Sequence, residues 1–577
     1  MKMMHFKTNI ITFLSILFFF HSTNLIAQQK NYPKNYFRSP VDFTITLSGN
    51  FAELRNNHFH SGIDIRTFTT GKKIYAIADG YVSRIKVSAG GYGKAIYIDH
   101  PNGFTSVYGH LNRFNKEINE FVKAHQYSKK TFAFDLNLEK DRFPVKKGDI
   151  IAISGNTGSS AGPHLHFEIR DTKSEHPLNP LHFGFKIKDT TPPKIFNLYA
   201  YPMDSLSSVN GKNTRQKFPV TYYNNAFHLK GDPKVVLSGN IGFALQVNDY
   251  LDNTWGKCGI YNMKVLVNDS LITNYTFNKF SFDESRYINS HMDYALNITE
   301  KRRIHKCFKE PNNKLSVYNY FSNNGIYHFK AGTKYKIDFL AKDTKNNLAK
   351  LRVYAQSKEN TQAFKQADYN QLLSATSENV FKADAVELKF PANSFYTDIK
   401  FKYSHKADTN LLSDIHSIHQ KTTPVHRYYT LAIKPNKSIK NENKLFIASL
   451  EKDGKFSNVG GIYINGWVKS KTRVFGDFAV VMDTIAPSIK SRTNFKLKNL
   501  SVREKISFTI KDELSGIKSY NGMIDGKWVL FEFDAKNNHL FYTFDKKRLL
   551  PNRKHKLQLE VLDKLGNKSR FESSFFW

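Results

Sequence analysis

Three short motifs near the start of the chain place histidine close to carboxylate, the residue types that bind transition metals. The first pairs His60 with Asp64, the second is Tyr108-Gly-His110-Leu111, and the third is Gly162-Pro-His164-Leu-His166-Phe-Glu168. Zinc binds histidine nitrogen and carboxylate oxygen at ~2.0–2.2 Å, and a catalytic zinc keeps one position open after three protein ligands. Two histidines and one aspartate would form such a site if the fold brings the motifs together.

The third motif alternates as a β-strand does. Side chains of a strand point to opposite faces with a period of two, so His164, His166 and Glu168 share one face while Leu165 and Phe167 pack behind it. Two neighbouring imidazoles repel each other when both are charged, whereas two neutral imidazoles can bind a cation together. Glu168 either orients a ligand imidazole from behind or forms a surface salt bridge.

Each motif has an ordinary explanation when it is taken alone. The two histidines of the third motif can be a satisfied polar pair. His60 and Asp64 can be a surface pair, and His110 can be a turn residue or a packed one. The hypothesis of a metal site depends on finding all three motifs within one compact β segment.

Two further patterns are rejected as catalytic sites. Gly158-Ser-Ser160-Ala-Gly162 fits the G-x-S-x-G pattern of serine hydrolases. That pattern needs a helix after the serine, whereas Pro163 and an alternating strand follow here. His416-Ser-Ile-His419 lacks the glutamate of H-E-x-x-H, which favours a structural or surface role.

The segment from Phe51 to Arg170 resembles the lysostaphin/LytM-type zinc endopeptidases. The resemblance extends beyond the histidine motifs to several glycine-rich turns. These are Ala78-Asp-Gly80, Gly91-Tyr-Gly93, Gly148-Asp149 and Ser154-Gly-Asn-Thr-Gly158. It implies an antiparallel β metallopeptidase domain that holds Zn2+ and cuts peptides of the bacterial cell wall.

The same resemblance implies a role for each motif residue. His60, Asp64 and His166 would be the zinc ligands, and His110 and His164 would be the catalytic histidines. A zinc ion lowers the pKa of water and polarises a carbonyl, while histidine exchanges protons in the neutral range. The chain departs from the compact family pattern at residues 115–143, a charged insertion with room for a short helix. We expect it to form one wall of the substrate groove or to occlude the groove.

The fold class expected for the whole chain is mainly β, with β-sandwich modules after the metallopeptidase domain. Short strand-like runs with β-branched residues and glycine turns dominate. Thr190-Thr-Pro-Pro193 and Asp483-Thr-Ile-Ala-Pro487 mark boundaries, and the segments after them are similar, which indicates a repeat. The expected units are a signal peptide at 1–27, the metallopeptidase domain at 36–188, an Ig-like β-sandwich at 190–356, a β-rich domain of unknown role at 357–482, and a second Ig-like β-sandwich at 483–577.

Composition bounds the location and the partners. The run from Ile10 to Phe20 is apolar but short, after two lysines, which is typical of a secretion signal. We therefore expect a periplasmic or extracellular protein with no transmembrane span once the signal is removed. The formal net charge is +35, which suits an acidic envelope, and no nucleic-acid motif accompanies it. Cys258 and Cys307 are either a disulfide or two buried thiols.

The leading hypothesis from the sequence is a secreted zinc endopeptidase that acts on the stem peptides of peptidoglycan. The alternative is a non-hydrolytic wall-binding protein that regulates or activates other wall hydrolases. The β modules are expected to act as spacers, to bind the wall, or to bind an envelope protein partner.

Overall fold

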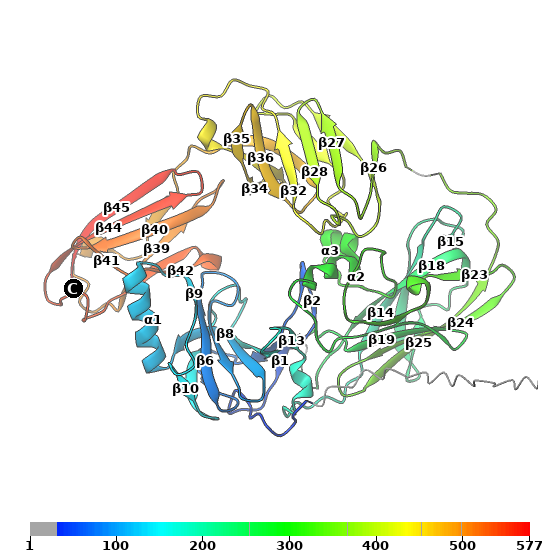
Figure 1. Cartoon of the computed structure of the whole chain (residues 1–577), viewed down its shortest axis with the longest axis horizontal. Coiled ribbons are helices and arrows are strands. Elements are labelled where there is room, and N and C mark those ends of the chain that lie inside the picture. The colour runs from blue at the N-terminus through cyan, green and yellow to red at the C-terminus, as the bar shows by residue number, and fades with distance from the viewer. Residues whose placement is uncertain (1–31, 253, 255, 366, 452, 498) are drawn as a thin grey trace, which may run out of the picture.

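The structure is a computed structural model that describes residues 32–577 except 253, 255, 366, 452 and 498. The signal segment expected at residues 1–27 lies outside the described residues. The chain is mainly β, as predicted, and it forms four β units that follow one another around a ring (Figure 1). Within the described ranges, no helix is long and apolar enough to cross a membrane.

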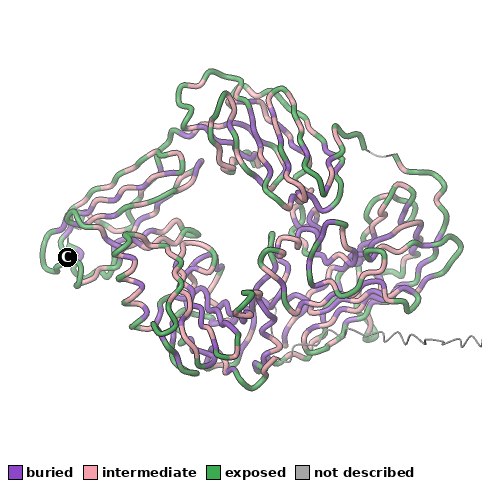
Figure 2. Tube along the Cα trace, in the orientation of Figure 1, coloured by how far each residue is buried: buried purple, intermediate pink, exposed green. Residues whose placement is uncertain are grey.

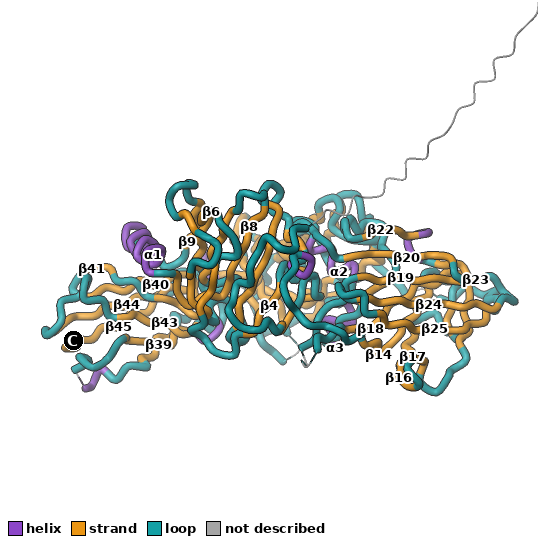
Figure 3. Tube along the Cα trace, turned by 90° about the horizontal axis from the view of Figure 1, so that it is seen from below, coloured by secondary structure: helices purple, strands orange, loops and turns teal. Residues whose placement is uncertain are grey.

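Each unit buries its own set of strand residues, as the burial colouring along the trace indicates (Figure 2). A view turned by 90° shows that the units lie in one layer (Figure 3). We refer to them as the first unit (residues 32–187), the second unit (194–357), the third unit (371–482) and the fourth unit (488–577).

The first unit is built on an antiparallel sheet that places the three motifs on neighbouring strands. Its main path runs β1-β4-β12-β8-β7-β6-β10. The strands of this unit are β1 (Leu47–Gly49), β2 (Leu54–Arg55), β3 (His58–Phe59), β4 (Ile63–Arg66), β5 (Lys73–Tyr75), β6 (Gly80–Val87), β7 (Lys94–Asp99), β8 (Phe104–Phe114), β9 (Phe134–Asn137), β10 (Pro144–Val145), β11 (Ile150–Ser154), β12 (His164–Asp171) and β13 (Pro177–Leu178). Leu165 and Phe167 of β12 are fully buried in the core, as the period of two predicts.

The insertion at residues 115–143 contains a helix and one added strand. Helix α1 (Lys116–Lys129) begins where the Asn115 side chain accepts a hydrogen bond from the Ile118 amide, a capping contact that stabilises a helix N-terminus. Strand β9 then pairs with β6. The insertion thus extends the sheet at the edge away from β4 and β12.

The second unit shares its hydrophobic core with the first. Phe51, Leu54 and Phe59 pack in the core cluster of the second unit, while Leu251 and Cys258 pack in that of the first. A domain boundary at residues 188–190 therefore separates the first and second units, whose side chains pack against each other. Both cysteines, Cys258 and Cys307, are free buried thiols.

The sheet of the second unit follows the path β15-β18-β14-β16-β17-β25-β24-β19-β20-β22. Its main strands are β14 (Lys194–Pro202), β16 (Gln216–Tyr223), β17 (Ala226–Leu229), β18 (Val235–Asn248), β19 (Asn262–Val267), β20 (Ser270–Thr276), β24 (Lys334–Lys342) and β25 (Leu348–Ser357), and its short strands are β15 (Ser208–Val209), β21 (His305–Lys306), β22 (Tyr318–Phe321) and β23 (Tyr327–Phe329). Two short helices, α2 (Ile288–His291) and α3 (Tyr294–Glu300), cover the boundary with the third unit (Figure 1).

The third and fourth units are each a pair of sheets packed on one core, the arrangement of a β-sandwich. In the third unit the sheets contain β28 (Val386–Phe390), β32 (Tyr429–Ile433) and β36 (Trp467–Thr472) on one side, and β31 (Ile415–Ile418), β33 (Leu445–Leu450) and β37 (Gly476–Met482) on the other. In the fourth unit they are β38 (Ser488–Ser491), β39 (Lys505–Lys511), β42 (Glu532–Asp534) and β43 (His539–Thr543), against β40 (Ile517–Ile524), β41 (Lys527–Trp528), β44 (Lys554–Asp563) and β45 (Lys568–Phe576). The immunoglobulin-like class of the modules stays a prediction.

The fourth unit returns to the first unit and closes the ring (Figure 1). The Tyr127 ring of α1 stands edge-on to Trp528, with ring centroids 5.3 Å apart. Lys94 Nζ lies 2.8 Å from Glu532 Oε2, and Lys123 Nζ lies 2.6 Å from Asp545 Oδ2. The insertion therefore provides a docking face for the C-terminal unit.

Candidate metal centre

The structure brings His60, Asp64 and His166 together in the interior of the first unit. Strands β4 and β12 pair so that Asp64 lies opposite His166, and His60 precedes β4 by one short loop. His60 Nε2 lies 3.1 Å from Asp64 Oδ1 and 3.0 Å from His166 Nδ1, and His166 Nδ1 lies 3.0 Å from the same oxygen. Ligands of a tetrahedral zinc are separated by about 3.3–3.6 Å at bond lengths of ~2.0–2.2 Å, so slight outward shifts would seat the ion.

The hydrogen bonds behind the two imidazoles identify which ring nitrogens face the cluster as acceptors. His60 Nδ1 lies 2.7 Å from the Asn50 carbonyl oxygen, and His166 Nε2 lies 2.8 Å from Glu168 Oε1. A nitrogen that faces an oxygen acceptor carries the proton. When these outer nitrogens carry the only ring protons, His60 Nε2 and His166 Nδ1 point lone pairs at each other and at the Asp64 carboxylate. Three acceptors that converge in a buried space require a positive charge between them, and these residues fit a zinc ion.

Burial and the mutual contacts of these three residues also set their pKa values. Burial lowers the pKa of His60 to about 4. Burial also disfavours the charged form of His166, but hydrogen bonds to Asp64 and Glu168 outweigh it and raise that pKa to about 9. Burial alone would raise the pKa of Asp64, but the charge of His60 and the hydrogen bonds from the histidines outweigh burial and hold that pKa well below its usual range. Without a metal, the cluster therefore keeps one proton, on His166, where a cation would otherwise lie.

Glu168 is fully buried behind His166, so the surface salt bridge considered for it is not formed. Its Oε1 accepts hydrogen bonds from the Ser61 hydroxyl at 2.6 Å and from the Tyr92 hydroxyl. Its Oε2 accepts from Arg170 Nε at 2.6 Å. The Arg170 guanidinium and His166 hold the pKa of this carboxyl well below its usual value against burial. Glu168 therefore fixes the orientation and tautomer of His166.

His110 and His164 stand beside the cluster, with ring centroids 4.7 Å apart. His110 has a left-handed backbone, with φ of 60°, where β8 shifts register against β7. A β-bulge of this kind redirects a side chain. His110 Nδ1 lies 2.8 Å from the Thr157 carbonyl oxygen and His164 Nδ1 lies 2.8 Å from that of Gly162, so Nε2 is the second titrating nitrogen of each ring.

Exposure separates the two kinds of histidine. His60 and His166 are 2% and 3% exposed, whereas the side chain of His164 is 15% exposed. Burial, together with His166 and His164, lowers the pKa of His110 to about 3. The ligand set is thus enclosed, and His164 is the most exposed of the four histidines.

Four supporting residues were not identified from the sequence. Asn50 holds His60 through its carbonyl, Arg55 contacts Asp64, and Ser61 and Tyr92 hold Glu168. Tyr92 belongs to the Gly91-Tyr-Gly93 turn, and Asn50 immediately precedes the segment that resembles the endopeptidases. Their roles depend on side-chain and backbone directions that a single sequence does not encode as a pattern.

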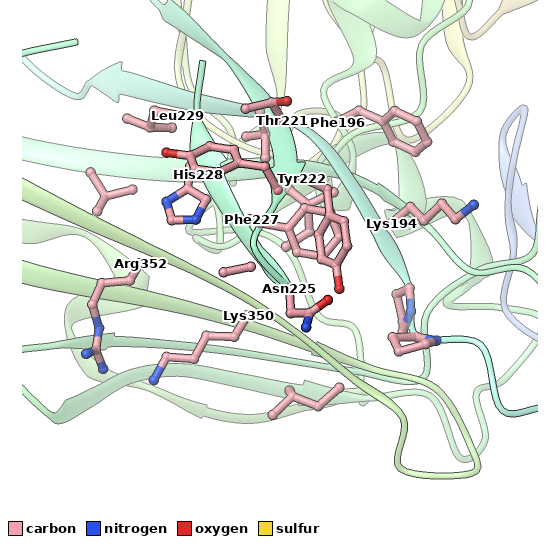
Figure 4. A pocket seen from close by; sticks show the side chains of 18 of the residues that line it. Lys194, Phe196, Thr221, Tyr222, Asn225, Phe227, His228, Leu229, Lys350 and Arg352 are labelled. Carbon is pink, nitrogen blue, oxygen red and sulfur yellow. The ribbon is translucent and has the colours of Figure 1, made fainter. Parts of the chain in front are cut away.

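A large cavity lies away from the metal cluster. It has a volume of about 1130 Å³ and lies in the second unit, where it is lined by Tyr222, Phe227 and His228 on one side and by Lys350 and Arg352 on the other (Figure 4). No group of three metal-ligating side chains faces it among the described residues. We assign the metal centre from the converging acceptors and not from cavity size.

The patterns rejected from the sequence form no catalytic group either. Ser160 Oγ lies 2.7 Å from the Gly162 carbonyl oxygen and 3.1 Å from His164 Nδ1, so it positions that histidine. His416 stacks beside Tyr403, whereas His419 bonds to Thr423.

Comparison with known proteins identifies the family of the first unit. The sequence profile of Peptidase family M23 matches residues 58–127 and 136–180, and that of the Zu5-like domain matches residues 370–483. An uncharacterized metalloprotease of Haemophilus influenzae is 37% identical over 109 residues, which are 19% of this chain and 18% of that protein. The DD-carboxypeptidase/endopeptidase Mpg of Neisseria meningitidis serogroup B is 31% identical over 132 residues, 23% of this chain and 24% of that protein.

Two further similarities also cover only part of the chain. The murein hydrolase activator NlpD of Salmonella dublin is 31% identical over 159 residues, 27% of this chain and 34% of that protein. A solved catalytic domain of the M23 protein EnpA from Enterococcus faecalis is 28% identical, with a TM-score of 0.19, and covers 27% of this chain and 98% of that domain. The chain spans about a fifth to a third of the length of these relatives. The first unit, which carries the three histidine motifs, is a peptidase family M23 domain.

Proposed function

We propose that this chain is a zinc-dependent endopeptidase that hydrolyses the peptide cross-links of peptidoglycan. One observation carries the proposal. The acceptor atoms of His60, Asp64 and His166 converge in a buried cluster, and the rings of two further histidines stand beside it. Two relatives whose names mention peptidoglycan or murein are each similar over 27% of this chain.

The chemistry divides between the ion and the side chains. Zinc held by the three ligands would polarise the scissile carbonyl and activate water. His164 Nε2 lies 3.4 Å from Asp64 Oδ1, at the edge of the cluster, where it can accept a proton from water. The histidine that takes up this proton, His164 or His110, can then return it to the leaving amine.

We also propose a location outside the cytoplasmic membrane, in the periplasm or the medium, where the substrate lies. The apolar segment Ile10–Phe20 after two lysines supports this location. The formal net charge of +35 favours contact with acidic wall polymers.

Mass spectrometry of purified peptidoglycan after incubation with the protein tests the activity. We expect new peptide ends with the zinc-loaded protein, and their loss in His166→Ala and after chelation. His58→Ala is the matched control, because His58 is exposed and bonds to the Asn56 carbonyl outside the cluster. Full activity of the zinc-free protein would refute the proposal.

Regulation of other wall hydrolases is the second candidate, and one contact favours it. Lys536 of the fourth unit donates hydrogen bonds to the carbonyl oxygens of Asn156 and Ser160, in the loop that holds His110 and His164. A C-terminal unit seated there narrows access to the site. If His166→Ala restored the wall phenotype of a strain that lacks the protein, regulation would replace hydrolysis as the function.

A further inference from the structure

The second and fourth units, each with an aspartate of the segment that leads into it, form the same group of three aspartates. In the second unit the group is Asp189, Asp249 and Asp343, and in the fourth it is Asp483, Asp512 and Asp563. In each group, one carboxylate oxygen from every residue lies within 4.8 Å of the others. The first aspartate precedes the first strand of the unit, and the other two end long strands.

The two groups are built by corresponding hydrogen bonds. Asn347 Nδ2 donates to Asp343 Oδ2 at 2.6 Å and to the Asp189 carbonyl at 3.2 Å. Asn567 Nδ2 donates to Asp563 Oδ2 at 2.7 Å and to the Asp483 carbonyl at 2.9 Å. The sequence repeat therefore corresponds to a repeated arrangement of three aspartates held by one asparagine.

The groups differ at the middle aspartate. Asp512 Oδ1 accepts hydrogen bonds from the Gly516 and Leu514 amides at 2.5 and 3.2 Å. Its counterpart Asp249 is only 3% exposed, and its Oδ1 has no hydrogen-bond partner among the residues that the structure describes. The chain after Asp249 takes a longer path to Gly259 than the chain after Asp512 takes to Gly516, so the short turn that supplies the amides is missing.

An unpaired carboxylate oxygen is costly to bury, and here two more carboxylates face it. Burial, followed by the charges of Asp189 and Asp343, raises the pKa of Asp249 to about 8. Burial and the charge of Asp343 raise the pKa of Asp189 to about 7. Lys345 acts on Asp189 from a distance, and the charges of the group and the burial of Asp249 outweigh it.

We propose that Asp189, Asp249 and Asp343 bind a calcium ion at the junction of the M23 domain and the second unit. The donors are all oxygens, which hard cations prefer to zinc or copper. Calcium binds oxygen at about 2.3–2.6 Å, so two oxygens on one ion lie no more than about 5 Å apart, as they do here. Asp189 is half-buried, which leaves a side for the ion to enter.

The ion would stabilise the segment that orients a zinc ligand. Asp249 and Cys258 exchange backbone hydrogen bonds of 2.9 Å. The next residue, Gly259, bonds twice to the Asn50 side chain, at 2.6 and 2.7 Å, and the Asn50 carbonyl holds His60. The calcium site therefore lies at the start of a continuous set of contacts that ends at the zinc centre.

Isothermal titration of CaCl2 into the full protein, with the zinc centre filled and calcium removed beforehand, tests the proposal. We expect one calcium ion per chain in the wild type and none in Asp249→Asn. Asp512→Asn is the matched control and should bind calcium as the wild type does, because Asp512 is already satisfied by amides. His166→Ala should also bind calcium, which separates this site from the zinc centre.

Thermal unfolding distinguishes loss of an ion site from loss of folding. Without calcium and above pH 8, where Asp249 would be ionised, Asp249→Asn should melt at or above the wild-type temperature, because it removes a repelled charge. With 1 mM CaCl2, on the order expected for extracellular sites, the wild type should melt higher than this variant. Calcium binding by Asp249→Asn at wild-type affinity, loss of the site in Asp512→Asn, or no binding by the wild type would overturn the proposal.

Discussion

Arg55 Nη2 lies 2.5 Å from Asp64 Oδ2, while Oδ1 of the same carboxylate faces His60, His164 and His166. The aspartate is thus held from one side and presents its other oxygen to the metal cluster. Arg55 also lies 3.4 Å from Glu53, which in turn pairs with Arg303. A ligand whose free oxygen is fixed in this way loses little freedom when it binds an ion.

Replacing Arg55 should weaken zinc binding without removing a ligand. We expect Arg55→Met to lower the zinc affinity by roughly 10–100-fold, the usual effect of removing a residue that supports a ligand. Competition with a chromophoric chelator measures the change. Arg303→Met is the control, since Arg303 contacts Glu53 and not Asp64. Equal affinities of wild type and Arg55→Met would show that Asp64 needs no such support.

Glu168 should contribute to both folding and metal binding. In Glu168→Gln the buried guanidinium of Arg170 loses its charged partner, and breaking a buried ion pair costs about 3–5 kcal/mol. Urea unfolding should show this loss, and the zinc affinity should fall as well because His166 Nε2 loses its carboxylate acceptor. Glu175→Gln, at an exposed partner 3.8 Å from Arg170, should change neither quantity. A stable Glu168→Gln protein would contradict the ion-pair argument.

The alternation of β12 could be predicted from the sequence because side-chain direction in a strand follows from period alone. The burial of Leu165 and Phe167, and the common face of His166 and Glu168, follow from it. The spacing of His60 and Asp64 suggested a ligand pair, but their approach to His166 depends on the register of β4 and β12. Only the resemblance to a known family supplied that register beforehand.

The rest of the site could not be predicted because its partners are distant in sequence or act through the backbone. Asn50 meets Gly259 across more than two hundred residues, and Lys536 reaches the loop of Asn156 and Ser160 from the far end of the chain. Lysines spread along a basic chain give no signal that one of them docks there. The insertion is expected to form a wall of the groove or to occlude it, which stays a prediction, and the contact of its helix α1 with the fourth unit had no signal in the sequence.

Zinc binding should depend on pH through His166. Without metal, its pKa is raised from 6.5 to about 9, so its protonated form stabilises the folded state fully below pH 6.5, and this contribution is lost as the pH rises through about 9. Zinc must displace that proton, so its apparent affinity should rise by about tenfold per pH unit between pH 6.5 and 9. Titration calorimetry in buffers of different ionisation enthalpy should detect release of one proton.

Unfolding of the metal-free protein gives an independent check on the same group. Its free energy of unfolding should fall between pH 6.5 and 9, and this fall should be absent in His166→Gln, which has no titratable ring. If the metal-free wild type instead became more stable over this range, the proton assigned to His166 would be misplaced.

The contact of Lys536 with the catalytic loop should be visible as local protection. Its ammonium group lies 2.9 Å from the Ser160 carbonyl oxygen and also bonds to that of Asn156, and this loop holds His110 through the Thr157 carbonyl. In Lys536→Ala we expect faster amide hydrogen exchange at residues 156–160 with little change in melting temperature. Lys490→Ala removes an exposed lysine of the same unit and should leave the exchange unchanged. Amides exchange fastest where few contacts oppose local opening. Identical exchange in both variants would therefore mean that the C-terminal unit does not restrain this loop in solution. The proposal of a regulated site would then lose its structural support.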